Sequence, residues 1–220
     1  MARDPNWREL TAVRHPDGKR RCAWCSTDPV YLRYHDEEWG VPVHADGALF
    51  EMLCLEGAQA GLSWITVLRK REEYRRAFDG FDPGKMQRYG AAKRAQLMQN
   101  AGIVRNRLKI EAFIGNARAY LALRDSGTSF DEFLWQFTGA APLKRRPQRL
   151  KDFQASSAHS DAMSKELKRR GFRFVGTTIC YAFMQAVGII DEHQRGCFRA
   201  GARAGAAAVR RGQLRERQQV

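Results

Sequence analysis

Apolar residues recur at every third or fourth position through most of the chain, which is the spacing of helices that each bury one face. The clearest case follows Asp46, where the apolar residues are Leu49, Phe50, Leu53 and Cys54. Strands would instead show apolar and polar residues in alternation, and such segments are scarce here. The pattern therefore predicts an all-α fold.

Helix boundary signals divide this pattern. Gly57 and Gly61 interrupt the first helix, so we expect a loop there. Ser63 is suited to cap a second helix that reaches Tyr74.

Further helices begin at strong capping signals. Asp82 and Pro83 combine a capping carboxylate with a proline at the first helical position. Ser129 and Glu132 lie three residues apart and form a capping box.

Two more helices are predicted towards the C-terminal end. Ser160 or Asp161 opens the first, which ends at the basic residues 168–170 followed by Gly171. The second runs to Gly188.

A short turn at Gly102 joins two helical stretches and is followed by Arg105, Arg107 and Lys109. Such a turn can present backbone N–H groups to an anion, and the next helix adds the positive end of its dipole. The segment is thus a candidate phosphate clamp. An ordinary corner between two helices is the alternative.

The chain has 220 residues, of which 44% are hydrophobic, enough for a real core in one domain or in two helical lobes. We expect the core to span residues 21–197. Residues 1–20 are polar and are predicted to pack loosely as a flexible extension. Residues 198–220 form a basic tail.

The chain carries 38 Lys and Arg residues against 24 Asp and Glu residues, a formal net charge of +14. This excess favours a polyanionic partner, with nucleic acid ahead of a membrane surface, although basic tails can also simply aid solubility. No run of 18 apolar residues predicts a membrane span, and no signal peptide is evident. Five cysteines without disulfide spacing fit a reducing cytoplasm.

Two pairs of soft donors lie about 160 residues apart: Cys22 with His35, and His193 with Cys197. Two thiolates and two imidazoles make up a closed tetrahedral zinc site, which would join the two ends of the core. Spacing alone leaves alternatives open, because Cys25 makes a competing pair with Cys22 and each residue could belong to an ordinary core.

Four segments together give the chain a resemblance to a known family. They are residues 22–24 (CAW), 34–42 (YHDEEWGVP), 55–64 (LEGAQAGLSW) and 174–181 (FVGTTICY). They resemble the bacterial 3-methyladenine DNA glycosylase I family, whose members remove alkylated adenine from DNA. The resemblance covers about residues 21–197 and implies the helix-hairpin-helix glycosylase fold, which agrees with the turn at Gly102.

The resemblance also implies one structural zinc ion per chain, which would be held by Cys22, His35, His193 and Cys197. Cys25 is then left out of the ligand set. Four protein ligands leave no open position for a reacting water, so such an ion would stabilise the fold.

A flipped base needs flat aromatic faces and a few polar groups. The resemblance assigns hydrogen bonding with the base to Glu56 and Tyr34, which we take as the catalytic pair. Tyr31, Trp39 and Trp64 lie in or beside the matched segments and are candidate base-binding faces. Each of the five could instead be a structural residue.

The resemblance places Gly61 and Leu62 in the space that a flipped base vacates. The turn described above makes Gly102, Arg105 and Lys109 candidate DNA-binding residues. Ala58 departs from the glutamine expected in the family. This departure leaves open a glycosylase of altered specificity.

We therefore expect a monofunctional DNA-3-methyladenine glycosylase that acts on alkylated double-stranded DNA as a monomer and leaves an abasic site. Glu111, the only acid between Gly102 and Arg124, is not assigned a catalytic role. The main alternative is a non-catalytic, zinc-stapled protein that binds damaged DNA, and a structural interaction module is a more remote one.

Overall fold

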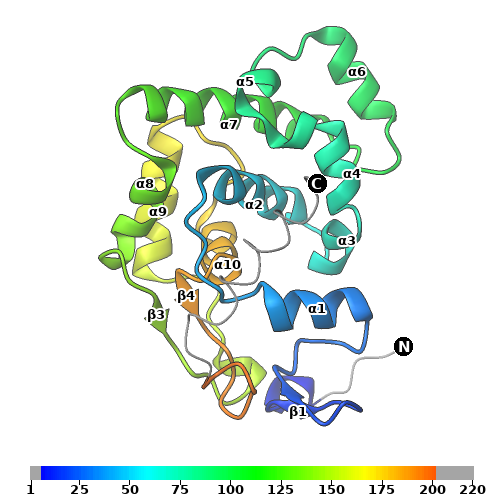
Figure 1. Ribbon diagram of the computed structural model, residues 1–220, viewed down its shortest axis with the longest axis vertical. Helices are drawn as coiled ribbons and strands as arrows, with labels where there is room; N and C mark the ends of the chain where they lie inside the picture. Colours follow the sequence, from blue (N-terminus) through cyan, green and yellow to red (C-terminus); the bar gives the residue numbers. More distant parts are fainter. Residues whose placement is uncertain (1–5, 202–220) are drawn as a thin grey trace, which may run out of the picture. The chain divides into compact units, whose positions relative to one another are not determined.

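The computed structural model describes residues 6–201 (Figure 1). These residues form two compact units. Unit 1 comprises residues 6–42, 142–154 and 185–201, and unit 2 comprises residues 43–141 and 155–184. The remainder of the basic tail, beyond residue 201, and residues 1–5 lie outside the described residues.

Unit 2 is built from helices. The α-helices are α2 (Asp46–Gln59), α3 (Trp64–Arg69), α4 (Arg71–Ala77), α5 (Pro83–Met86), α6 (Ala91–Gln99), α7 (Arg107–Asp125), α8 (Phe130–Trp135), α9 (Ala158–Arg169) and α10 (Thr177–Ala186), whose last two residues belong to unit 1. Two 3-10 turns, η2 (Asp79–Phe81) and η3 (Gln136–Thr138), connect them.

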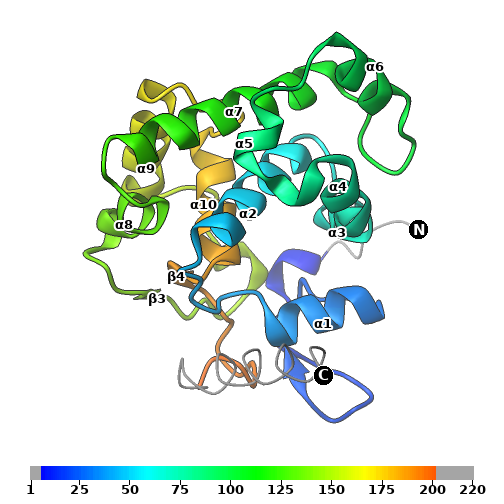
Figure 2. The ribbon, with the colours of Figure 1, turned by 45° about the horizontal axis from the view of Figure 1, so that its top comes forward.

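Helix α2 lies at the core of unit 2. It packs against α3, α7 and α8, and it runs beside α7 in both ribbon views (Figures 1 and 2). The four apolar residues that follow Asp46 in the sequence are all fully buried. The predicted helical face is therefore the face that packs.

Two capping signals are confirmed, whereas Ser63 stands at the N-cap of α3 without a side-chain capping bond, because its hydroxyl contacts the Thr66 hydroxyl at 2.8 Å. Asp82 accepts a hydrogen bond from the backbone N–H of Lys85 at 3.1 Å. Ser129 and Glu132 bond reciprocally, each side chain accepting from the other residue's backbone N–H at 3.1 Å. Gly171 ends its helix with a φ of +89°.

Three boundaries differ from the prediction. Helix α2 continues through Gly57, because a glycine there allows Phe174 to approach: an added Cβ would lie 3.2 Å from the Phe174 Cβ. The predicted second helix breaks at Lys70 into α3 and α4. Helix α9 begins with Ser157 as its cap, since the Ser157 hydroxyl accepts the N–H of Ser160.

Unit 1 contains one α-helix, α1 (Pro29–Glu37), among its described residues apart from the end of α10, together with the 3-10 turns η1 (Trp7–Glu9) and η4 (Leu150–Asp152). Strands β1 (Val13–Arg14) and β2 (Arg20–Arg21) pair antiparallel, and β3 (Leu143–Lys144) pairs in parallel with β4 (Ile190–Asp191). Each strand has two residues, too few to show an alternating pattern. The protein is therefore mostly helical rather than purely so.

Residues 6–20 were expected to pack loosely, but they form part of unit 1. The backbone oxygen of Leu10 accepts hydrogen bonds from the Leu150 N–H at 3.0 Å and from the Gln194 side chain at 3.1 Å. Ala12 is buried. Backbone pairing and these contacts fix a segment whose polar sequence gives no sign of burial.

No described helix is long and apolar enough to cross a membrane.

Candidate functional site

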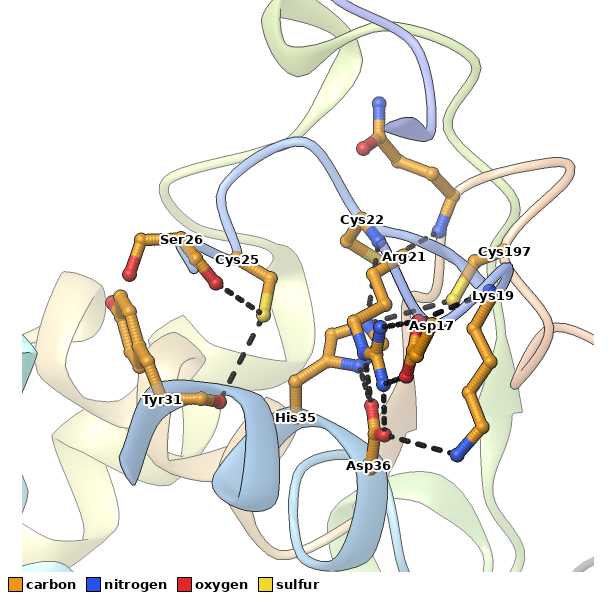
Figure 3. Close-up of polar contacts among 11 residues, drawn as sticks. Asp17, Lys19, Arg21, Cys22, Cys25, Ser26, Tyr31, His35, Asp36 and Cys197 are labelled. Carbon is orange, nitrogen blue, oxygen red and sulfur yellow. Dashed lines mark hydrogen bonds and ion pairs between the residues drawn. The ribbon is translucent and has the colours of Figure 1, made fainter. Parts of the chain in front are cut away.

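Three of the predicted metal ligands lie together in unit 1. The donor atoms of Cys22, His35 and Cys197 all lie within 4.8 Å of one another, and all three residues are buried (Figure 3). Cys22 directly follows β2, His35 comes from α1, and Cys197 lies after β4. The Phe198 N–H donates to the Arg20 oxygen at 2.8 Å, so the segment after β4 lies beside β2 and donors from both ends of the sequence meet.

His193 lies beside this group. Its ring centroid is 5.2 Å from that of His35, and the residue is buried. Its Nε2 is buried without a hydrogen-bond partner among the described residues. A buried imidazole nitrogen without a partner costs free energy, whereas a metal ion would use its lone pair. The donor set therefore suits a soft divalent cation.

Each of the two imidazoles is held by a carboxylate through its Nδ1. His35 Nδ1 lies 2.9 Å from Asp36 Oδ1, and His193 Nδ1 lies 3.0 Å from Asp191 Oδ1. Carboxylates in this position fix the ring orientation and leave Nε2 as the donor to a metal.

The two thiols differ in acidity. A hydrogen bond with Cys22 lowers the pKa of Cys197, whereas burial raises the pKa of Cys22 above its usual range. The Cys22 thiol thus stabilises the Cys197 thiolate. Ionisation of the buried Cys22 as well would need a nearby cation.

Cys25 lies outside the three-residue group. Its thiol is directed at the backbone oxygens of Ser26, 3.6 Å away, and Tyr31, 3.8 Å away (Figure 3). The structure thus separates Cys25 from Cys22, although their spacing in the sequence is that of a metal-binding pair.

The aromatic candidates of unit 1 gather around a fourth ring. Trp24 has ring centroids 5.4 Å from Tyr31, 6.5 Å from Tyr34 and 4.8 Å from Trp39. The ring centroid of Trp39 also lies 4.6 Å from that of His193, which joins the aromatic group to the candidate metal ligands. Sequence analysis did not single out Trp24, although it belongs to the segment 22–24 that carries the resemblance.

Glu56 lies in unit 2, near the C-terminal end of α2. The residue is 3% exposed, and its Oε2 has no hydrogen-bond partner among the described residues. Burial raises the pKa of Glu56 to about 8. A buried carboxyl group with a free oxygen is costly for the fold and is well suited to bind a polar ligand.

The loop after α2 reaches the surface. Gly61 has a φ of +77° and open space around its Cα, and Leu62 is 40% exposed. Trp64 begins α3 directly afterwards and is buried.

The Gly102 turn joins α6 and α7 as predicted, and it needs its glycine. A Cβ at Gly102 would lie 2.1 Å from Cγ of Glu73. The N–H groups of Gly102 and Val104 donate to Asn100 and to the Tyr74 hydroxyl. These two backbone donors are therefore occupied within the protein.

The cations that follow the turn differ. Arg105 is exposed, whereas Lys109 is 6% exposed. The Lys109 ammonium donates to the backbone oxygens of Ala58 at 2.8 Å and Ala60 at 2.7 Å. Arg105 and Arg107 thus present their charges to solvent, whereas Lys109 does not.

Known proteins are similar to this chain over most of its length. The pattern that defines the methyladenine glycosylase family matches residues 24–200. DNA-3-methyladenine glycosylase 1 of Escherichia coli (strain K12) is 54% identical over 177 residues, which are 80% of this chain and 95% of that protein.

Solved structures of the same family are also similar to this chain over most of its length. A crystal structure of 3-methyladenine DNA glycosylase I has a TM-score of 0.80 and 53% identity, covering 81% of this chain and 98% of its own. The enzyme from Staphylococcus aureus, described for its recognition of 3-methyladenine, has a TM-score of 0.80 and 37% identity, covering 83% and 97%. The chain therefore belongs to the methyladenine glycosylase family.

Proposed function

We propose that the protein is a monofunctional DNA glycosylase that releases 3-methyladenine from alkylated DNA by hydrolysis of the N-glycosidic bond. The observation that carries the proposal is the buried carboxyl group of Glu56, with one free oxygen, on the helix that leads directly into the exposed Leu62 loop. The relatives are named for this activity. We expect it to act in the cytoplasm, as a monomer, on double-stranded DNA.

Excision requires that the damaged nucleotide leave the stack and enter a pocket. Tyr31, Trp39 and Trp64 are the aromatic side chains proposed to receive it. Stacking on an aromatic ring contributes roughly 1–3 kcal/mol per base. A methylated purine with a positive charge gains a further cation–π attraction that neutral adenine lacks. Gly61 and Leu62 are proposed to fill the space left in the duplex.

Glu56 and Tyr34 are proposed to contact the base edge. Two solved relatives support this pair: one carries a Tyr→Phe change in complex with 3-methyladenine, and the other carries a Glu→Gln change. In their own numbering the two changed positions are separated by as many residues as Tyr34 and Glu56 are here.

The lesion supplies part of the driving force. Methylation at N3 makes the base a cationic leaving group, and the electrons of the glycosidic bond pass to it as the bond breaks. Positive charge then moves to the sugar, water adds to its C1′, and the water's proton passes to solvent. The protein's contribution is shape, stacking and electrostatic positioning rather than a strong base. Glu111, which lies 3.6 Å from Arg94, is again given no catalytic role.

We further propose that Cys22, His35, His193 and Cys197 hold one structural zinc ion. The clustered donors of three of these residues and the buried, unpartnered Nε2 of His193 support this set. The ion would tie α1 and the segment after β2 to the turn after β4, and four protein ligands would leave no open position for substrate.

Release of free bases from methylated duplex DNA, separated by chromatography, tests the proposed function. The parent protein is expected to release 3-methyladenine, and Glu56→Gln to release it at least 10-fold more slowly. Glu51→Gln is the matched control on the same helix, because Glu51 is already paired with Arg75 at 2.7 Å. DNA binding without release of any base would overturn the proposal in favour of a damage-binding protein. Release of other bases instead would indicate altered specificity.

A further inference from the structure

Lys109 occupies an unusual position for a basic residue beside a DNA-binding turn. It lies in the first turn of α7, three residues after the N-cap Asn106, yet it is 6% exposed. Its ammonium group points into unit 2, where it donates to the backbone oxygens of Ala58 and Ala60. The exposed neighbours Arg107 and Leu108 belong to the same helical turn.

Both acceptors belong to the C-terminal end of α2. Ala58 is in its last turn, and Ala60 is its C-cap. The last four carbonyl groups of a helix have no partner within the helix, and they carry the negative end of its dipole. A buried ammonium at this end is therefore the complementary group, and it satisfies two carbonyls in one place.

These two bonds fix the backbone between Glu56 and Leu62. The Leu62 N–H closes a tight turn by donating to the Gln59 oxygen at 2.6 Å. The loop therefore leaves the helix at the residues whose carbonyl groups Lys109 binds. Movement of the Ala60 carbonyl would shift both the end of α2 and the loop tip.

Lys109 also bears a cost that a phosphate contact would not. Burial lowers the pKa of Lys109, because the charged form loses solvent. A free ammonium aimed at DNA would stay hydrated until it bound. The two carbonyl bonds offset this cost, and they are made in the protein without DNA.

We propose that Lys109 is a positioning residue, which holds the loop of Ala60, Gly61 and Leu62 and the Glu56 end of α2 in the geometry needed for excision, and that it does not contact a phosphate. This inference rests on the proposed glycosylase function. It also separates the role of Lys109 from that of the exposed Arg105, which is proposed as the phosphate contact.

The test compares Lys109→Met with Arg105→Met. Methionine keeps the apolar stem of Lys109 and removes the donors, while Arg105→Met removes an exposed charge a few residues away. Two quantities are measured: the single-turnover excision rate at saturating protein, and the salt dependence of binding to undamaged duplex DNA. A lost phosphate contact makes the slope of log K against log salt shallower by about 0.9.

Lys109→Met is expected to lower the saturated excision rate by at least 10-fold with the salt slope unchanged, because a misplacement of about 1 Å can cost on the order of 100-fold in rate. Arg105→Met is expected to make the slope shallower by about 0.9, which shows that the assay detects the loss of one phosphate contact. A Lys109→Met protein with a shallower slope and a normal rate would overturn the inference.

Hydrogen exchange supplies a readout that does not depend on activity. The Leu62 N–H should exchange faster in Lys109→Met than in the parent, while amides in the middle of α7 are unchanged. If Lys109→Met does not fold, Lys109→Gln is measured in its place, because its amide group keeps hydrogen-bond donors. Its saturated excision rate is expected to fall, but by less than 10-fold. A parent protein that releases no base contradicts the proposed function itself. If the parent is active, and the variant has the same excision rate and the same Leu62 N–H exchange rate, only the role of Lys109 is contradicted.

Discussion

Nδ1 of His35 lies 2.9 Å from the Asp36 carboxylate, and the same carboxylate accepts two hydrogen bonds from Arg21, at 2.8 and 2.6 Å (Figure 3). Arg21 is held from its other side by two further bonds to Asp17, at 2.9 and 2.7 Å. Asp17 lies in the connection between β1 and β2, ahead of residues 24–200 that match the family. The N-terminal hairpin thus supports the candidate ligand His35 through Arg21 and Asp36.

Asp36→Asn is expected to weaken metal binding by about 10- to 100-fold, because a neutral amide orients the His35 ring less firmly than the carboxylate does. Competition with a coloured zinc chelator measures the change. Glu37→Gln, an exposed neighbour on α1, is the control and should bind metal as the parent does. Equal affinities for Asp36→Asn and the parent would contradict the role of Asp36.

Cys197→Ser is expected to lose the zinc equivalent and to unfold at a lower temperature, with base excision affected only as a consequence. Structural zinc contributes on the order of 10 kcal/mol of folding free energy at neutral pH. Cys25→Ser is the matched control, since its buried thiol faces two backbone oxygens outside the ligand group. Metal analysis of the purified proteins and their melting curves give the answer, and one full zinc equivalent in Cys197→Ser would contradict it.

Helix boundaries were predictable where the deciding contacts are local. The reciprocal bonds of Ser129 and Glu132 involve residues three apart, so the sequence contains both partners. The prediction of a loop at Gly57 was wrong, because the contact that favours glycine there is distant in sequence. Gly57 lies inside the helix and gives room to Phe174, more than one hundred residues away. The two-residue strands were invisible because pairing across the fold, rather than a pattern, defines them.

The candidate site likewise has parts that the sequence predicts and parts that depend on distant contacts. The two Cys and His pairs suggested a metal site from residue types alone, but the family resemblance was needed to leave Cys25 out of it. The carboxylate partner of His193 is Asp191, two residues away, and could have been noticed. The contacts of Lys109 could not have been predicted, because the carbonyl groups that accept its hydrogen bonds lie about fifty residues earlier. A lysine that follows a turn is more simply interpreted as a phosphate contact.

Glu56→Gln is expected to make the protein more stable than the parent at alkaline pH, by an amount that depends on pH. Burial raises the pKa of Glu56 from 4.5 to about 8, so the folded state holds a proton that the unfolded state releases. The parent's stability relative to the variant is therefore greatest below pH 4.5. It falls as pH rises from 4.5 to 8 and levels off above 8.

Melting temperatures of both proteins between pH 5.5 and 8.5 measure this difference. All other titrating groups are common to the two proteins, so their contributions cancel in the comparison. A constant difference between Glu56→Gln and the parent across this range would mean that Glu56 is ionised in the folded protein throughout.

Gly188→Ala is expected to destabilise unit 1 far more than Gly18→Ala. Both glycines have positive φ, +73° and +81°, so alanine at either position costs about 1–2 kcal/mol in backbone strain. At Gly188 the added Cβ would also lie 2.4 Å from the Pro42 nitrogen and the Val41 carbonyl carbon, whereas at Gly18 it meets nothing within 4 Å. Backbone atoms cannot rotate away as a side chain can, so overpacking adds about 1–3 kcal/mol at Gly188 alone. Urea unfolding with zinc present measures both variants, and equal midpoints would show that the segment at Val41 and Pro42 yields without cost.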